Sequence, residues 1–225
     1  MINTDTRTER ILVAARALML RYGYDKTTVN DVAKEAGVSK GAVYLHYVSK
    51  EDIFETVFWR EFWIYTDETI KRVEADTEPW TFVRMYEHGL LAVAESALLQ
   101  ALMRGDEAIL GSFLRKRGNV LMTFKQPYQS EFLTLMQSVH AVRDDLDVDA
   151  AAYLLNVISY GFLNAMVEIP SGQRPSIEIV ITEMARMLQG YLVPQDGGDH
   201  EAGKQIILKM SRLMREEIRK KLDKE

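Results

Sequence analysis

The sequence predicts an all-α protein with a small N-terminal domain and a larger C-terminal domain. Apolar residues recur at helical spacing along nearly the whole chain, and no useful stretch alternates with the period of a strand. Gly, Pro, Ser and Thr separate these apolar segments where helices would begin and end. The first 50 residues carry a net charge of +3, against −5 for the whole chain of 225 residues, which distinguishes the N-terminal part.

The first predicted helix lies within residues 7–24 (RTERILVAARALMLRYGY). Its apolar face contains Ile11, Ala15, Leu18 and Tyr22, with Leu12 and Met19 beside them. Gly23 is expected to end this helix, because glycine readily adopts the left-handed conformation found after a helix.

Short helices follow, each introduced by a hydroxyl side chain. Thr27 and Thr28 provide the N-cap of the second helix, and Gly37 ends it. The buried side of this helix is expected to comprise Val29, Val32, Ala33 and Ala36. Ser39 caps a third helix over residues 41–47. Ser49, with Asp52 three residues later, resembles a capping box for a fourth helix that extends from Lys50 into the mid-seventies.

Helical spacing continues through the rest of the chain. Further helices are predicted over residues 80–103, 106–118, 127–142, 148–168, 175–192 and 204–222. The segment 194–203 (PQDGGDHEAG) reads as a flexible linker. The predicted domains are therefore residues 1–50, residues 51–193, and residues 194–225 as a linker with an additional amphipathic helix.

Composition excludes several classes of site. The chain has no cysteine, so disulfides, thiolate nucleophiles and zinc–thiolate sites are ruled out, and a reducing cytoplasm is the expected location. The mixed-charge N-terminus does not resemble a secretory signal. Residues 150–167 lack charge and approach the length of a membrane span, but Asn156, Ser159 and Asn164 interrupt them. A buried helix is the better interpretation, and no membrane partner is expected.

Residues Gly37–Gly41 spell G-x-S-x-G, the pattern of a hydrolase nucleophile elbow. An elbow requires a buried strand before the glycine, yet the preceding segment VNDVAKEA has helical character. The four histidines also follow no recognisable triad order. No catalytic residue, metal site or cofactor is therefore predicted, and an enzyme is disfavoured.

A helix-turn-helix explains the same residues better. Ala33 and Gly37 supply the small residues that two crossing helices require, and Val38 is expected to fill the core. Ser39 would then cap a helix suited to the major groove of DNA. That helix offers Lys40 at its start, small residues at Gly41 and Ala42, and hydrogen-bonding groups on Tyr44 and His46.

The segment TTVNDVAKEAGVSKGAVYLHYVSKEDIF resembles the DNA-binding signature of the TetR (tetracycline repressor) family of transcription regulators. The resemblance covers about residues 7–58. Tyr47 stands where phenylalanine is usual, and Val43 where leucine or isoleucine is common. The resemblance implies phosphate contacts from Thr28, Lys40, Tyr44 and Lys50. It also implies that a second set lies at or near base edges: Ser39, Lys40, Gly41, Ala42 and His46.

The C-terminal part suggests a dimer that binds a ligand. A helix that is apolar on nearly all sides, as 148–168 is, must be buried all round. With helix 175–192 it could form a four-helix interface between two copies, as is typical of the family, and a twofold dimer suits a palindromic operator. Residues 59–136 could line an effector pocket. The candidates are Trp59, Phe62, Trp63, Tyr86, Met103, Phe113, Phe124 and Phe132, with His88, Glu95 and Arg104 as polar anchors.

The resemblance therefore implies a repressor whose unknown small-molecule effector tilts the fourth helix and changes the spacing of the two recognition helices. The alternative is a regulator of the same fold that is controlled by a protein partner, or that acts as an activator, without a small ligand. The basic amphipathic helix 204–222 could pack on the body or the partner subunit, or contact a membrane surface or an acidic partner.

Overall fold

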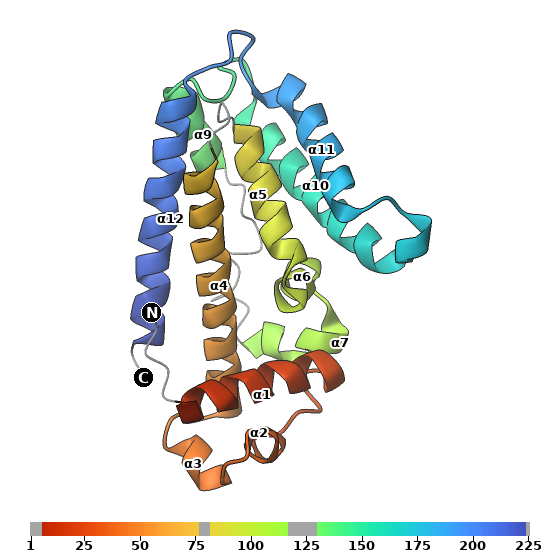
Figure 1. The fold of residues 1–225 in the computed structure, drawn as a ribbon, viewed down its shortest axis with the longest axis vertical. Helices are drawn as coiled ribbons and strands as arrows, with labels where there is room; N and C mark the ends of the chain where they lie inside the picture. Colours follow the sequence, from red (N-terminus) through yellow and green to blue (C-terminus); the bar gives the residue numbers. More distant parts are fainter. Residues whose placement is uncertain (1–5, 77–81, 117–129, 224–225) are drawn as a thin grey trace. The chain divides into compact units, whose positions relative to one another are not determined.

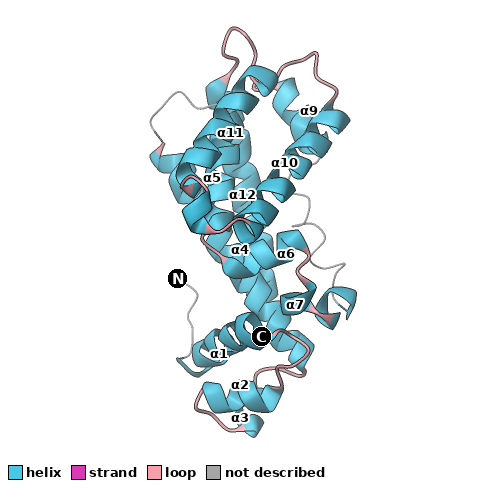
Figure 2. Ribbon diagram, turned by 90° about the vertical axis from the view of Figure 1, so that its right-hand side faces the viewer, coloured by secondary structure: helices cyan, strands magenta, loops and turns pink. Residues whose placement is uncertain are grey.

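The computed structural model describes residues 6–76, 82–116 and 130–223. Within these ranges every regular element is a helix, which confirms the all-α prediction (Figure 2). The helices shown in Figure 1 are α1 (Thr6–Tyr22), α2 (Val29–Glu35), α3 (Lys40–Tyr44), α4 (Lys50–Ala75), α5 (Phe82–Ala94), α6 (Ala97–Arg104), α7 (Glu107–Leu110), α9 (Ser130–Ser138), α10 (Val148–Glu168), α11 (Ile177–Leu192) and α12 (His200–Leu222).

The chain forms two compact units, each assembled from segments distant in sequence. Unit 1 contains Met1–Ile64, Ala97–Lys125 and Glu216–Glu225. Unit 2 contains Tyr65–Ser96 and Gln126–Arg215. Helices α4 and α12 contribute residues to both units. The predicted domain boundaries after residues 50 and 193 divide the chain by expected function. The two compact units follow packing instead, so their boundaries lie elsewhere.

The predicted caps and glycine stops of the N-terminal helices are confirmed, but α3 ends at Tyr44, three residues before the predicted end at Tyr47. Gly23 and Gly37 have φ angles of 81° and 65°, the left-handed conformation that glycine adopts without strain. Thr28 caps α2 with a complete capping box, and Ser39 Oγ accepts a hydrogen bond from the Ala42 amide to cap α3. Ser49 Oγ accepts from the Asp52 amide at the start of α4, at 3.1 Å.

Helices α1 to α4 share one apolar core in unit 1. Its fully or almost fully buried residues include Ile11, Ala15, Met19, Val32, Ala33, Val43, Tyr47, Ile53 and Phe54. Two predictions about this core were wrong. Tyr22 is 52% exposed because it ends α1, and Val38 is only half-buried at the turn.

Two ion pairs hold α1 on α4. Arg16 Nε lies 2.6 Å from Glu61 Oε1, and the adjacent Arg60 pairs with Glu9, about two helical turns before Arg16 on α1. Glu61 is buried, so its charge requires a partner to offset the loss of hydration. The pairs therefore orient α1, and with it the helix-turn-helix, on the first half of α4.

The turn between α1 and α2 lies directly against residues 108–112. The Tyr24 amide donates to the Ile109 carbonyl at 2.8 Å, and the Ser112 amide donates to Asp25 Oδ2 at 3.0 Å. A Cβ at Gly23 would lie 2.2 Å from the Ala108 carbonyl oxygen, which no real contact allows. Glycine is thus required at position 23 both by the backbone conformation and by this close approach.

Several predicted helix bounds were wrong in the C-terminal part. The segment 80–103 forms two helices, because α5 ends at Ala94 and α6 starts at Ala97 after Ser96. The segment 106–118 is interrupted at Gly111, where φ is 46°, although Asp106 caps α7 as an acceptor. The segment 127–142 is helical from Ser130 to Ser138, with residues 127–129 outside the described residues.

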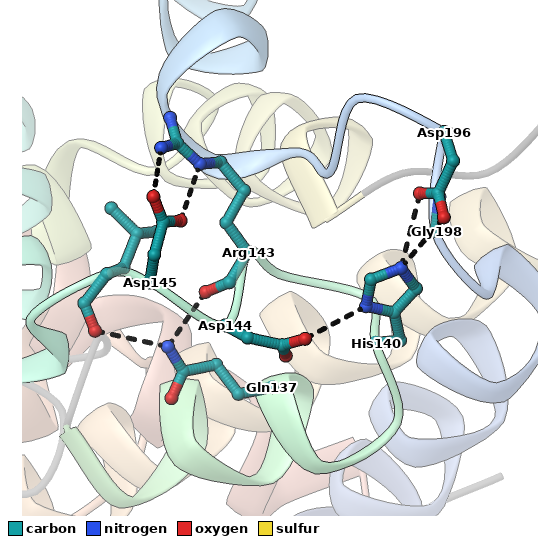
Figure 3. A network of polar contacts seen from close by, with 8 residues as sticks. Gln137, His140, Arg143, Asp144, Asp145, Asp196 and Gly198 are labelled. Carbon is teal, nitrogen blue, oxygen red and sulfur yellow. Dashed lines mark hydrogen bonds and ion pairs between the residues drawn. The ribbon is translucent and has the colours of Figure 1, made fainter.

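The predicted linker 194–203 is shorter than expected. Asp199 Oδ1 accepts from the Ala202 amide at 2.9 Å, so α12 begins at His200, one turn earlier than predicted. The remaining connection is tied to the turn after α9 (Figure 3). His140 Nε2 lies 3.1 Å from Asp196 Oδ2, and the His140 carbonyl accepts from the Asp199 amide at 3.0 Å.

His140 lies between two carboxylates in this network. Asp196 faces Nε2, and Asp144 faces Nδ1 at 3.4 Å (Figure 3). The hydrogen bond with Asp196 is the main reason why the pKa of His140 is raised above its ordinary value of 6.5. The folded protein therefore favours protonated His140 more than the unfolded chain does, so this contact stabilises most below that pH.

Replacing His140 by Asn is expected to reduce the pH dependence of stability. The stabilisation is fully present below pH 6.5 and is lost as the pH rises through the folded-state pKa of His140. The melting temperature of the wild type should therefore fall more between about pH 6 and about pH 8 than that of H140N. Asn suits the site because position 140 has a φ of 55°. Identical pH dependence in both proteins would contradict this role.

Candidate nucleic-acid interface

Helix α3 presents one face to the core and another to solvent. Val43 and Tyr47 are buried, whereas Tyr44 is 47% exposed and Lys40 and Gly41 are also exposed. The Lys40 ammonium lies 5.9 Å from the centroid of the Tyr44 ring, within the range of a cation–π contact. The exposed face therefore combines a cation and a phenol hydroxyl, both of which can donate to phosphate oxygens.

Gly41 has no structural requirement for glycine in the chain itself. Its backbone is helical, and an added Cβ would meet only Ser39 Oγ, at 3.9 Å, an ordinary van der Waals distance. Nothing in the chain therefore requires glycine at position 41, which is consistent with the sequence interpretation that a small residue leaves room for an approaching DNA surface.

The Thr28 hydroxyl is already used in helix capping. It donates to Asp31 Oδ2 at 2.6 Å and accepts from the Asp31 amide at 3.2 Å. The hydrogen bond from this hydroxyl also lowers the pKa of Asp31. A phosphate contact from Thr28 requires the hydroxyl to turn away from Asp31, and it stays a prediction.

Lys50 is less free than the sequence suggested. Its ammonium lies 3.9 Å from the centroid of the Tyr24 ring, and burial lowers its pKa. The Tyr24 hydroxyl donates to Glu51 Oε1 at 2.9 Å, and Lys116 Nζ donates to the same oxygen at 2.6 Å. Chiefly because of Lys116, the pKa of Glu51 falls to about 2. The start of α4 is thus braced by a cluster that the sequence analysis missed.

The eight residues predicted to contact DNA all lie in unit 1, at the start of α2, on or beside α3, and at the start of α4. None of them belongs to the buried core. Ala42 and His46 are half-buried, and the His46 ring lies 6.5 Å from the Tyr47 ring. The structure therefore brings the predicted residues to one end of unit 1, while their contacts with DNA stay a prediction.

The residues predicted to line an effector pocket are divided between the two units. Trp59, Phe62, Trp63, Met103 and Phe113 lie in unit 1, Tyr86 and Phe132 lie in unit 2, and Phe124 is outside the described residues. Phe113 is fully buried as a core residue, with its ring centroid 5.2 Å from those of Phe58 and Tyr24.

Tyr86 is also fully buried, and its hydroxyl lies 3.1 Å from Ser159 Oγ. Burial raises the pKa of Tyr86 to about 12, so its phenol is neutral at physiological pH. Phe132 is half-buried, with its ring 5.7 Å from the Phe82 ring. Of the two predicted pocket residues in unit 2, Tyr86 is the one with a polar group, and that hydroxyl is buried.

The three predicted polar anchors already have partners in the structure. His88 Nε2 lies 3.1 Å from Asp76 Oδ2, and Arg72 contacts both oxygens of Glu95 at 2.8 and 2.9 Å. Arg104 lies 3.3 Å from Asp106. A ligand that bound to these side chains would have to compete with existing hydrogen bonds and ion pairs.

The short helices α2 and α3 are joined by a tight turn and share a core with α1, and α3 exposes one face to solvent. This arrangement is a helix-turn-helix, the motif of many DNA-binding regulators. The family model described as "Bacterial regulatory proteins, tetR family" matches residues 11–57, which include α2, α3 and the start of α4. Residues 11–57 therefore form a DNA-binding domain of the TetR family of transcription regulators.

Similar proteins are regulators as well. YfiR of Bacillus subtilis (strain 168), described as an uncharacterized HTH-type transcriptional regulator, is 31% identical over 99 residues, or 41% of this chain and 46% of that protein. The chain thus matches less than half of YfiR. The probable acrEF/envCD operon repressor of Escherichia coli (strain K12) is 26% identical over 66% of this chain and 70% of its own length.

A solved structure shares the fold at low identity. The transcriptional regulator FadR from Bacillus subtilis, in complex with stearoyl-CoA, matches with a TM-score of 0.62 and 18% identity. The match covers 80% of this chain and 96% of FadR. The described helices therefore follow the architecture of known regulators beyond the N-terminal motif.

Proposed function

We propose that this protein is a cytoplasmic transcriptional repressor that binds a palindromic operator as a dimer and is released by a small-molecule effector. The observation that carries the proposal is the exposed face of α3, where Lys40 and Tyr44 flank the unobstructed Gly41. Cationic and hydroxyl donors can hold phosphates while small residues allow a helix to approach base edges. The similarity to the acrEF/envCD repressor supports repression as the outcome.

An exposed apolar surface on α10 and α11 supports the dimer. Helix α10 is apolar and long enough to span a membrane, yet only 33% of its most apolar window is buried within the single chain. The surface comprises Tyr153 (71% exposed), Leu154, Val157 and Tyr160 on α10 with Ile179 and Met187 on α11. A second copy of the same surface would remove these side chains from water, as expected of an isologous interface.

Aromatic and methionine side chains can line an adaptable apolar pocket, and FadR, which shares the fold, holds stearoyl-CoA. An apolar or amphiphilic effector is therefore the class to test first. The alternative is a regulator of the same fold that is controlled by a protein partner, or that acts as an activator, without a small ligand.

Operator selection tests the proposal. Purified protein is used to enrich bound fragments from random DNA, and each recovered sequence is compared with its own reverse complement. A palindromic consensus is expected, with a half-site spacing set by the dimer. Failure of a folded, dimeric protein to enrich any sequence would overturn the proposal.

The selected operator then serves to test effector release. Stearoyl-CoA and a series of shorter acyl-CoAs can be titrated into the protein–operator complex, with free coenzyme A as the control. A ligand that binds the protein and lowers operator affinity would support release. Ligand binding without a change in operator affinity would contradict it, because coupling requires different affinities in the two states.

Replacing Lys40 by Ala is expected to weaken the salt dependence of operator binding. Each phosphate contact that is lost reduces the slope of log K against log salt by about 0.9, so a dimer should lose about 1.8. Lys209→Ala is the control, since Lys209 is exposed on α12, away from α3 in the sequence. An unchanged slope for K40A would show that Lys40 does not contact phosphate.

A further inference from the structure

Leu45 and Val48 have the largest exposed fractions among the large apolar residues in the described part of the chain. Leu45 is 80% exposed and Val48 is 86% exposed. Isolated exposed apolar residues are common on protein surfaces. Leu45 differs in its position, because it directly follows α3 among residues predicted to contact DNA.

The backbone places Leu45 on the outward face of the recognition helix. Leu45 has helical φ and ψ angles of −71° and −24°, and its amide donates to the Gly41 carbonyl at 3.2 Å. It therefore lies one helical turn beyond Gly41 on the same face. At about 100° per residue, position 45 is about 160° from both Val43 and Tyr47, which are buried in the core.

Leu45 lies between two lysines in the sequence, and its side chain suits a different part of DNA from theirs. Lys40 precedes it on α3, and Lys50 follows at the start of α4, so cations flank it along the chain. Those cations suit phosphates, whereas a leucine side chain cannot satisfy a phosphate oxygen. Within the major groove, the apolar group on a base edge is the C5-methyl of thymine. An exposed apolar side chain at the C-terminal end of α3, on the same face as Gly41, matches that group.

We propose that Leu45 is a specificity-determining residue that contacts the C5-methyl group of one thymine in each operator half-site. The inference rests on the proposed function, since it requires α3 to enter the major groove. Burial of this methyl group against Leu45 removes apolar surface from water on both sides of the contact. This contact distinguishes thymine from the other bases at that position without a hydrogen bond from α3.

Deoxyuridine substitution isolates the methyl group, because uracil has the hydrogen-bonding groups of thymine without the C5-methyl. Each thymine of the selected operator is replaced in turn, symmetrically in both half-sites. At one position the wild type should bind about fourfold more weakly per half-site, or about 15-fold with both replaced, as expected for one buried methyl group. Leu45→Ala should bind the thymine and deoxyuridine operators equally at that position.

Val48→Ala is the matched control, because Val48 is similarly exposed but lies three residues further along, where its amide donates to Asp52 of α4. V48A should keep the wild-type preference for thymine. Thermal melting should show that L45A is folded, since the side chain is exposed. Retention of the preference by L45A, its loss in V48A, or a wild type without any thymine-sensitive position would each overturn the proposal. Failure of the selection to yield an operator would instead overturn the proposed function.

Discussion

Replacing Val157 by Asp is expected to convert the proposed dimer into a monomer and to weaken operator binding by about 100-fold or more. Val157 lies on the exposed apolar face of α10, one turn from Tyr153 and from Tyr160. In an isologous interface each protomer would bury one new carboxylate, so the desolvation penalty would apply twice. A monomer would contact one half-site and lose the high effective concentration of its second recognition helix.

Leu135→Asp is the matched control for V157D. Leu135 is 40% exposed on α9, close to the 46% of Val157, and lies outside the proposed interface. Sedimentation velocity would report the oligomeric state, and fluorescence anisotropy would report operator affinity. The dimer surface is misassigned if V157D stays dimeric or if L135D dissociates equally. A monomeric V157D with full operator affinity would instead show that dimerisation is not needed for binding.

Replacing Phe113 by Ala should lower the free energy of unfolding by about 3–5 kcal/mol, the usual cost of removing a buried aromatic ring. Phe113 is fully buried, stacks with Phe58 at an interplanar angle of 15°, and contacts Tyr24 in the turn after α1. Its removal would leave a cavity beneath that turn, which residues 108–112 already contact. Such a loss is a large part of the 5–15 kcal/mol that stabilises typical domains.

Urea denaturation of F113A and Phe113→Leu would measure the effect. Leucine keeps much of the apolar volume, so F113L should lose less stability than F113A. The comparison also decides between two interpretations of Phe113. A residue lining an open pocket would tolerate alanine with little loss of stability but with altered ligand affinity. That result would restore the pocket role that the sequence predicted and would contradict the core role.

Local features of the fold could be predicted from the sequence because their causes lie within four residues. Thr28 caps α2 through Asp31, and Ser39 caps α3 through Ala42. Gly23 and Gly37 end helices through their own φ angles. Hydrogen bonds of this kind depend on neighbouring residues, so the pattern of hydroxyl, carboxyl and glycine residues is sufficient to locate them.

The sequence also predicted which side chains of α3 are exposed, but not the contacts of Lys50. The exposed positions of Lys40, Gly41 and Tyr44 follow from the buried positions of Val43 and Tyr47 on a short helix. The state of Lys50 does not follow in this way, because its ammonium rests on Tyr24, 26 positions earlier in the chain. Glu51 and Lys116 complete that cluster from still more distant positions.

The sequence by itself determined the all-α class, the helix-turn-helix and the exposed face of α3, because these follow from helical periodicity and short-range hydrogen bonds. Only the tertiary structure decided that Phe113 belongs to the core, that His140 holds the connection before α12, and that α10 keeps an exposed apolar face. Burial and ion pairing depend on residues that approach through folding from far along the chain. Apolar composition alone cannot distinguish a core side chain from one that lines a pocket or an interface.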